Sequence, residues 1–324
     1  MDAQRVIVFF ESGDCVAYSH SGEELWSRQL SSQYGPFVAE FGLGASPCQT
    51  SAHVFVLLEH DGPSYLLALD KGNGEVAWAA ERTPRRSWSS PAIIQVMGQP
   101  QVVVSSAGSI DGYDPQSGEL LWTFSDVGGN TGTTPIDCGQ GRFLVGASAG
   151  RNGQSAAEAK RSNGMLQVER TAEGWHARRL WVAEDVSPSW ASPIVYQGFA
   201  YWVNRAGVIF CFDAQTGEQV YAQRSKQPCW ATPLASQERL YFFGKSGLVT
   251  VIAAGREFNK LAENQIWDEG QLPPEAPLAA DEVTEERRRA AANFRAPTLY
   301  GYAVANGRLV ARVGNQLFCI AQAP

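Results

Sequence analysis

Four aromatic residues at one repeated position are the first candidates for chemistry in this sequence. Each stands three residues before a proline that follows a small residue, and they are Trp88, Trp190, Trp230 and Phe294. Rings at equivalent positions around one opening could stack on a flat conjugated ligand or on a sugar. Three nearby arginines, Arg85, Arg86 and Arg295, could bind its anionic groups. The same rings could instead pack on one another as a structural plug, so both interpretations stay open.

Other motifs predict neither catalytic nor metal-binding residues. Residues 146–150 read GASAG and match the letters of a serine-hydrolase nucleophile motif, but that motif requires a strand leading into a helix of an α/β sheet. The four histidines have no metal-ligand spacing. The six cysteines include neither a C-x-x-C motif nor an adjacent pair. We therefore expect binding rather than bond-making chemistry.

The elements that would position the aromatic residues are short β-strands. A motif of a small residue followed by proline recurs at intervals of 40 to 64 residues, at Pro47, Pro91, Pro135, Pro193, Pro233 and Pro297. Between these prolines lie runs rich in Val, Ile, Tyr and Phe, separated by Gly and Asn turns. About four strands per repeat is the pattern of a propeller blade. The sequence therefore predicts an all-β fold, a seven-bladed β-propeller of four-stranded antiparallel blades.

A second repeat, Asp-x-x-x-Gly-Glu-x-x-aromatic, predicts how each blade ends. Its Asp can accept hydrogen bonds from the following turn, and its Gly can adopt a positive φ. The aromatic ring then falls at one register of the outermost strand, where it can dock one blade against the next. The residues assigned to this structural role are Asp70, Asp114, Asp213, Gly74, Gly118, Gly217, Trp26, Trp78, Trp122 and Tyr221.

The chain is expected to form one domain over residues 1–324. Blade four lacks the second repeat, which predicts a longer and less regular outer hairpin. Residues 267–294, rich first in proline and then in charge, are expected to form an inserted loop with a short helix between blades six and seven. The first unit lacks its first strand and the last unit its last strand. We therefore expect the natural protein to carry roughly 30 more residues upstream, the length of the missing strands.

The segments ALDKGNGEVAW, GYDPQSGELLW and CFDAQTGEQVY resemble the repeats of the pyrroloquinoline quinone (PQQ) β-propeller family, in the quinoprotein alcohol dehydrogenase-like superfamily. The resemblance covers nearly the whole chain. The family includes quinone-dependent alcohol and sugar dehydrogenases and the outer-membrane barrel-assembly lipoprotein. The resemblance thus implies a bacterial protein of the periplasm or another extracytoplasmic compartment, which the residues themselves do not identify.

These features favour a non-catalytic binding or scaffold protein that uses loops and the aromatic channel mouth on one propeller face. The resemblance also implies an alternative, a PQQ-dependent alcohol or sugar dehydrogenase with Ca²⁺ beside the quinone. The family's enzymes carry adjacent cysteines and an acidic and Asn ligand set, and this sequence has no adjacent cysteines and no such repeated cluster. A carbohydrate-binding propeller is the second alternative. The sequence thus favours a protein without a cofactor or an enzymatic activity, and it leaves a quinone-dependent dehydrogenase with PQQ and Ca²⁺ open as the enzyme alternative.

Composition limits the class of partner. The net charge is -7 and the pI about 5.2, with no window that concentrates Lys and Arg, so a nucleic-acid partner is not expected. The longest apolar runs have five residues, too few to cross a membrane. The expected partner is another protein or a carbohydrate, bound by a monomer.

Overall fold

The computed structural model describes residues 1–39, 42–150, 153–268, 270, 272, 299–314 and 316–321. Their strands form seven antiparallel sheets, which we call blades one to seven in chain order. Blades one to four belong to unit 1 (Met1–Asp185) and blades five to seven to unit 2 (Val186–Pro324). This confirms the predicted fold class, a seven-bladed β-propeller whose first and last blades have three strands. Phe294, Arg295 and residues 273–294 of the predicted insertion lie outside the described residues.

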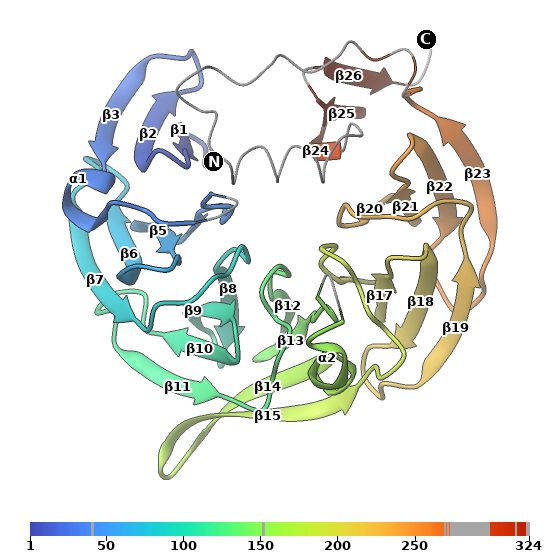
Figure 1. Cartoon of the computed structure of the whole chain (residues 1–324), viewed down its shortest axis with the longest axis horizontal. Coiled ribbons are helices and arrows are strands. Elements are labelled where there is room, and N and C mark those ends of the chain that lie inside the picture. The colour runs from blue at the N-terminus through green and yellow to red at the C-terminus, as the bar shows by residue number, and fades with distance from the viewer. Residues whose placement is uncertain are drawn as a thin grey trace. The chain divides into compact units, whose positions relative to one another are not determined.

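In unit 1 each strand pairs with the next one along the chain, as Figure 1 shows. Blade one comprises β1 (Arg5–Phe9), β2 (Asp14–Ser19) and β3 (Glu24–Gln29), followed by α1 (Ser31–Tyr34). Blade two comprises β4 (Cys48–Gln49), β5 (His53–Leu58), β6 (Ser64–Asp70) and β7 (Val76–Arg82). Blade three comprises β8 (Ala92–Val96), β9 (Gln99–Ser106), β10 (Ser109–Tyr113) and β11 (Leu120–Phe124). Blade four comprises β12 (Ile136–Gly139), β13 (Arg142–Val145), α2 (Ala156–Ser162), β14 (Gly164–Thr171) and β15 (Gly174–Val182).

Unit 2 follows the same pattern. Blade five comprises β16 (Ile194–Tyr196), β17 (Phe199–Val203), β18 (Val208–Asp213) and β19 (Gln219–Arg224). Blade six comprises β20 (Leu234–Ser236), β21 (Arg239–Phe243), β22 (Leu248–Ala253) and β23 (Lys260–Gln265). Blade seven comprises β24 (Leu299–Ala305), β25 (Arg308–Val313) and β26 (Gln316–Ala321). Neither helix in the described part of the chain has the length and hydrophobicity needed to cross a bilayer.

The middle strands of the blades are buried on both faces, which explains their unbroken apolar runs. In β5, Val54 and Val56 pack in a core shared with blade one. The alternate residues Phe55 and Leu57 pack in a second core shared with blade three. Because successive side chains of a strand point to opposite faces, each face of this strand must be apolar. The hydrophobic cores of unit 1 therefore lie between blades.

The Asp-Gly repeat closes the outer hairpins. Asp70 Oδ1 accepts hydrogen bonds from the N–H groups of Gly72 and Asn73 at 2.7 and 3.1 Å. Gly74 then adopts a φ of 74°, which other residues resist. The same two bonds recur at Asp114 and Asp213. Backbone N–H groups, that of Thr216 foremost, hold the pKa of the Asp213 carboxyl below its usual value.

Two of the predicted docking rings reach the turn glycine of the following blade. The Trp26 Nε1 donates to the Lys71 carbonyl at 2.9 Å, and a Cβ added at Gly74 would lie only 2.5 Å from the ring. Trp78 has the same relation to blade three, where its Nε1 donates to the Pro115 carbonyl at 3.2 Å and its ring covers Gly118. Gly74 and Gly118 therefore serve both the turn and the approach of a ring.

Trp122 lies differently from Trp26 and Trp78. Its ring covers Gly112 of its own blade, and its Nε1 donates to Gln101 Oε1 at 2.7 Å. The ring also packs against Phe143 of blade four, with centroids 6.2 Å apart. Blade four has no turn glycine of the repeat to receive the ring. Blades one and two have Ala17 and Ala68 at the position that Gly112 occupies in blade three. Because Gly112 has no side chain, it leaves room for the Trp122 ring.

Blade four differs from the prediction of an irregular outer hairpin. Strands β14 and β15 form a long hairpin, interrupted by one register shift between Met165 and Leu166. The irregular stretch lies between β13 and β14 and contains α2, which the sequence patterns did not predict. The Asn163 side chain fixes this segment, because its amide donates to the carbonyls of Ala147 and Ala159 at 3.0 and 2.9 Å.

His60 fixes the segment that follows α1. Its Nδ1 accepts hydrogen bonds from the N–H groups of Val38 and Gly62 at 3.2 and 2.9 Å, so the ring must carry its proton on Nε2. The ring packs edge-on against Phe37, and the residue is fully buried. Burial lowers the pKa of His60, although the neighbouring Asp61 opposes this shift.

The lowered pKa of His60 predicts a pH-dependent stability. As the pH falls below the ordinary histidine value of 6.5, the unfolded chain takes up a proton before the folded chain does. The free energy of unfolding should therefore decrease between pH 6.5 and the lower pKa of the buried ring. The variant His60→Asn keeps an acceptor atom but cannot titrate, so it should lose this slope. Urea denaturation at a series of pH values measures how the free energy of unfolding changes with pH in the wild type and in the variant. Equal slopes of the two proteins would contradict a lowered pKa of His60.

Candidate functional site

Trp190 and Trp230 form an aromatic pair in unit 2. Trp190 precedes β16, and Trp230 occupies the equivalent position before β20. Their ring centroids are 4.5 Å apart and their planes are at 68°, an edge-to-face arrangement. The Lys245 Nζ lies 4.0 Å from the centroid of the Trp230 ring. Because Trp190 remains 46% exposed, the pair presents apolar ring surface beside a positive charge.

Two hydrogen bonds anchor the segments that carry these three residues. The N–H of Ser192 donates to Thr232 Oγ1 at 3.0 Å, which ties the segment before blade five to the segment before blade six. Lys245 lies in the turn between β21 and β22, and its N–H donates to the Pro228 carbonyl at 2.8 Å.

Trp88 belongs to unit 1 and packs on the backbone. Its Nε1 donates to the Gly42 carbonyl at 3.2 Å, and its N–H donates to the Thr131 carbonyl at 2.7 Å. A Cβ added at Gly44 would lie 3.0 Å from the Trp88 ring. This ring therefore fills space between the segments that lead into blades two and three.

The two described arginines that were predicted to bind anions already have protein partners. Arg86 forms a two-pronged ion pair with Asp61, in which Nη2 lies 2.6 Å from Oδ2. Arg85 donates from Nη1 to Ser109 Oγ at 2.8 Å. Among the candidates for ligand binding, the structure thus brings together Trp190 and Trp230, while Phe294 and Arg295 lie outside the described residues.

The hydroxyl residues just before the repeated prolines have a role that the sequence patterns did not reveal. The N–H of Ser46 donates to Ser90 Oγ at 2.9 Å, and the N–H of Ser90 donates to Thr134 Oγ1 at 3.2 Å. Ser192 and Thr232 repeat this contact in unit 2. Each bond links one repeat to the next. The signal was present in the sequence, because Ser or Thr precedes the proline in the first five copies of the motif.

A buried ion cluster joins blades two and three. The Arg82 guanidinium lies 2.7 Å from Glu59 Oε1 and 2.9 Å from Asp111 Oδ2. It also donates to the hydroxyl of Tyr113, and Ser106 Oγ donates to Glu59 Oε2 at 2.5 Å. Burial opposes the charge on Arg82, but the surrounding acidic groups, Glu59 foremost, outweigh it and raise the pKa of the guanidinium. Each charged side chain of the cluster therefore has a hydrogen-bond partner within the protein.

The described residues do not fit the cofactors of the quinone-dependent enzymes. In the ranges that the structure describes, no three His, Cys, Asp or Glu side chains are grouped so that they could hold a metal ion. All six cysteines are unpaired, and none is adjacent to another in the sequence. Burial raises the pKa of the Cys48 and Cys138 thiols to about 12, so these side chains are poor nucleophiles.

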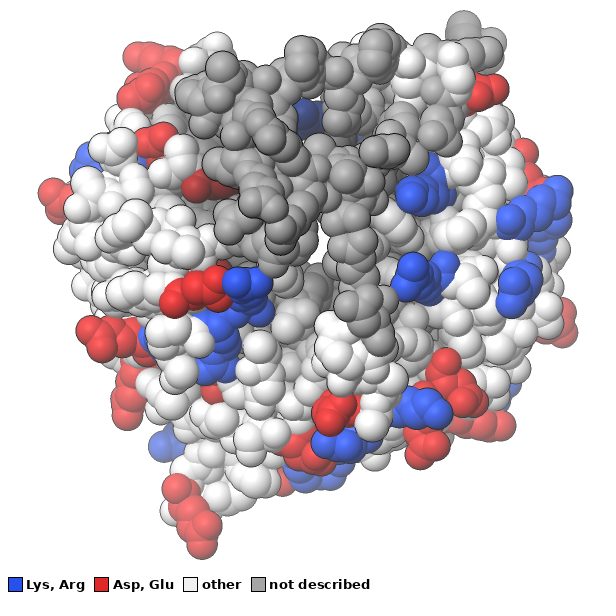
Figure 2. All heavy atoms as spheres, viewed as in Figure 1, with Lys and Arg blue, Asp and Glu red and all other residues white. Residues whose placement is uncertain are grey.

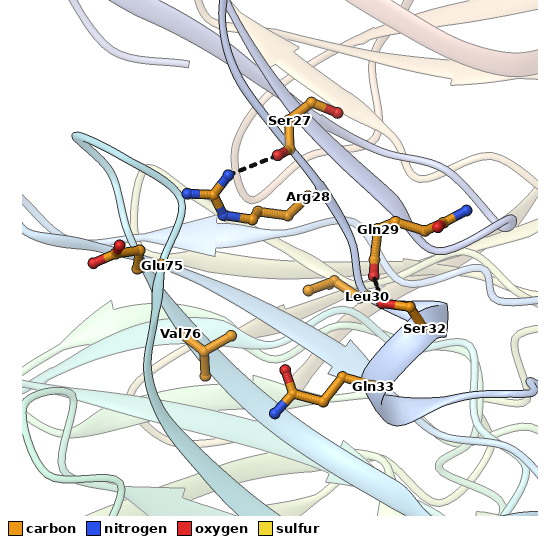
Figure 3. A pocket seen from close by; sticks show the side chains of 8 residues that line it. All are labelled: Ser27, Arg28, Gln29, Leu30, Ser32, Gln33, Glu75 and Val76. Carbon is orange, nitrogen blue, oxygen red and sulfur yellow. Dashed lines mark hydrogen bonds between the residues drawn. The ribbon is translucent and has the colours of Figure 1, made fainter.

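A hollow of 480 Å³ lies in unit 1 beside β3, α1 and β7 (Figure 3). Two of its polar side chains bond to nearby backbone. Arg28 donates to the carbonyls of Ser27 and Asn73 at 2.9 and 2.6 Å, and Ser32 Oγ donates to the Gln29 carbonyl at 2.8 Å. None of the residues predicted to bind a ligand lines it. We therefore assign it no ligand.

Charge is distributed in small groups on the face shown in Figure 2. Some Lys and Arg side chains lie beside Asp and Glu, at the left and at the lower edge of the view, and others at the right have no acidic side chain next to them. Such a distribution favours recognition of a partner through local contacts over long-range attraction of a partner by a surface of one charge sign.

Comparison with known proteins identifies relatives of this chain. A family model described as "Outer membrane protein assembly factor BamB" matches residues 1–201 and 170–315. Among solved structures, BamB from Moraxella catarrhalis is 14% identical, with a TM-score of 0.65 over 98% of this chain and 81% of that protein. The computationally designed protein Ika8 is 13% identical, with a TM-score of 0.60 over 97% and 79% of the two chains.

The quinohemoprotein alcohol dehydrogenase from Comamonas testosteroni is 12% identical, with a TM-score of 0.56 over 96% of this chain and 61% of the enzyme. At such identities the structural likeness establishes the fold alone. Among curated proteins, none matches this chain.

Proposed function

Because the chain belongs to the family of the outer membrane protein assembly factor BamB, we propose that it is a non-catalytic scaffold. In this proposal it works in the periplasm and binds other proteins during the assembly of outer-membrane proteins. The family membership supports this function directly. The mismatch between the described residues and a quinone-metal site supports it against a dehydrogenase.

The observation that carries the proposal is the exposed tryptophan pair. Tryptophan is enriched among the few interface residues that supply most of the binding energy. Trp190 is 46% exposed beside Trp230, and Lys245 adds a cation next to the rings. A partner side chain that combines an apolar body with a nearby carboxylate would match this surface.

The same rings could instead recognise a sugar. In that case, addition of oligosaccharides would lower the tryptophan fluorescence of the protein, and Trp190→Ala would remove that effect.

The proposal predicts a defect in cells that lack the gene. Deletion in the native host should lower the folded fraction of outer-membrane β-barrel proteins, measured as their resistance to unfolding in detergent without heating. Wild-type protein should restore the fraction, whereas the double variant Trp190→Ala/Trp230→Ala should not, because each hot-spot tryptophan is worth about 2 kcal/mol or more of binding.

A matched control is Leu261→Ala on β23, which removes an apolar side chain that is 47% exposed in the same unit. This variant should restore folding like the wild type. Two results would contradict the proposal. One is an unchanged folded fraction after deletion, and the other is saturable dye-linked oxidation of an alcohol or glucose by the purified protein with PQQ and Ca²⁺.

A further inference from the structure

Blades five and six carry a basic residue at the same position of the same kind of turn. The turn between β17 and β18 reads NRAG at residues 204–207, and the turn between β21 and β22 reads GKSG at residues 244–247. Each turn is closed by a hydrogen bond of 3.0 Å from the N–H of its last residue to the carbonyl of its first. Because the two turns have the same length and the same closing bond, Arg205 and Lys245 are equivalent residues of neighbouring blades (Figure 1).

One segment of the chain, residues 225–230, is bonded to both turns. Ser225 donates from its N–H and from its Oγ to the Gly207 carbonyl of the first turn, each at 2.8 Å. Gln227 Oε1 accepts a hydrogen bond from the Ser246 N–H of the second turn at 3.1 Å. The segment ends with the second tryptophan of the aromatic pair. The two basic turns and the aromatic pair therefore belong to one connected surface of unit 2.

Gln227 performs for the second turn what a residue of the turn itself performs in blade five. There, Asn204 Oδ1 accepts hydrogen bonds from two N–H groups that follow it, at 3.0 and 2.9 Å. In blade six the first turn residue is Gly244, and the equivalent two N–H groups donate to Gln227 Oε1 instead. A Cβ added at Gly244 would lie only 2.4 Å from that oxygen. The turn that carries Lys245 is thus built around a side chain of the segment that carries the tryptophan.

The cations of the two turns differ from other cations nearby in their lack of a carboxylate partner. Lys226 and Lys260 form ion pairs with Glu263 at 2.6 and 3.2 Å. Within the part of unit 2 that the structure describes, no ion pair includes Arg205, which is exposed, or Lys245, which is half-buried beside a ring of the aromatic pair. Both cations therefore match a partner that brings its own carboxylates.

We propose that the two basic turns and the aromatic pair together bind an acidic segment of a partner protein, in which apolar residues lie between carboxylates. This inference rests on the proposed function, since it states which chemistry the scaffold recognises in its partner. The apolar residues pack on the exposed Trp190 ring, and the carboxylates before and after them pair with Arg205 and Lys245. Exposed charges of this kind govern the choice of partner more than the affinity. Arg205 is therefore a residue that determines specificity.

Three synthetic peptides test this pattern with the full chain. The probe is the fluorescein-labelled peptide GSEDLFEDSG, in which acidic residues stand on both sides of Leu-Phe. One control, GSQNLFQNSG, replaces the carboxylates by amides, and the other, GSEDSSEDSG, replaces the apolar residues by serines. The probe should bind saturably in fluorescence anisotropy at low salt. Both controls should bind about tenfold more weakly, because each lacks one of the two kinds of contact.

Variants of the protein assign each contact. Arg205→Ala and Lys245→Ala should each weaken binding of the probe about threefold, the effect of one exposed ion pair, and should leave the weak binding of the amide peptide unchanged. Trp190→Ala should weaken binding of the probe roughly 30-fold, the loss of one hot-spot side chain. The matched control is Arg239→Ala, which removes an exposed arginine at the opposite end of β21 from Lys245 and should bind like the wild type.

Four results would overturn the inference: no saturable binding of the probe, equal affinity for the amide peptide, an equal loss in Arg239→Ala and Arg205→Ala, or binding to phosphatidylglycerol vesicles that the probe does not inhibit. The last result would assign the surface to an anionic membrane. All four are measured on purified protein and are independent of the folding assay in cells. Failure here would therefore leave the proposed function standing.

Discussion

Replacing Arg82 with alanine is expected to destabilise the protein by about 3–5 kcal/mol, because it leaves two buried carboxylates without their cation. The side chains of Glu59 and Asp111 are 1% and 7% exposed, so water cannot replace the guanidinium. Chemical denaturation monitored by circular dichroism measures the loss.

Arg86→Ala is the matched control for this prediction. Arg86 also forms an ion pair, with Asp61, but the two side chains are 46% and 38% exposed. Removing an exposed pair should cost less than about 1 kcal/mol. If Arg82→Ala cost no more than Arg86→Ala, the cluster between blades two and three would not contribute to stability as described.

Replacing Trp122 with alanine is expected to cost about 3–5 kcal/mol, the range for removal of a large buried side chain. The ring is 5% exposed and lies between blades three and four. Its loss would leave a cavity over Gly112 and would deprive Gln101 of a hydrogen-bond donor. Urea denaturation of the variant and the wild type measures the difference.

A second substitution tests the geometry of this site. A Cβ at Gly112 would overlap the Trp122 ring, so Gly112→Ala alone should be strongly destabilising. In a Trp122→Leu background the same change should cost much less, because the smaller side chain leaves room. Additive effects of the two substitutions would show that the ring does not occupy this position.

The two repeated sequence motifs were sufficient to predict the blades. The six repeated prolines, together with a first unit that lacks one, indicated seven repeats. The paired Asp and Gly of blades two, three and five made the turns of those outer hairpins predictable from local chemistry. The unbroken apolar run at Val54–Leu58 indicated a strand, but only the structure shows that its alternate residues serve two different cores.

Contacts between repeats could not be predicted from these patterns. Arg82 meets Glu59, 23 residues earlier, and Asp111, 29 residues later, and no local pattern links the three. The candidate site was predicted in part. The position three residues before the repeated prolines identified Trp190 and Trp230. It did not reveal Lys245, which comes from a hairpin turn of blade six. It also did not reveal that Arg85 and Arg86 have partners within the protein.

We propose that this chain holds another protein at the Trp190–Trp230 pair. Photo-crosslinking in living cells from a benzoylphenylalanine residue placed at position 190, with position 261 as the control, tests this proposal. We expect a discrete crosslink from position 190 to a protein of the outer-membrane assembly pathway, lost when Trp230→Ala is added. Crosslinks of equal yield from both positions, or none from position 190, would contradict it.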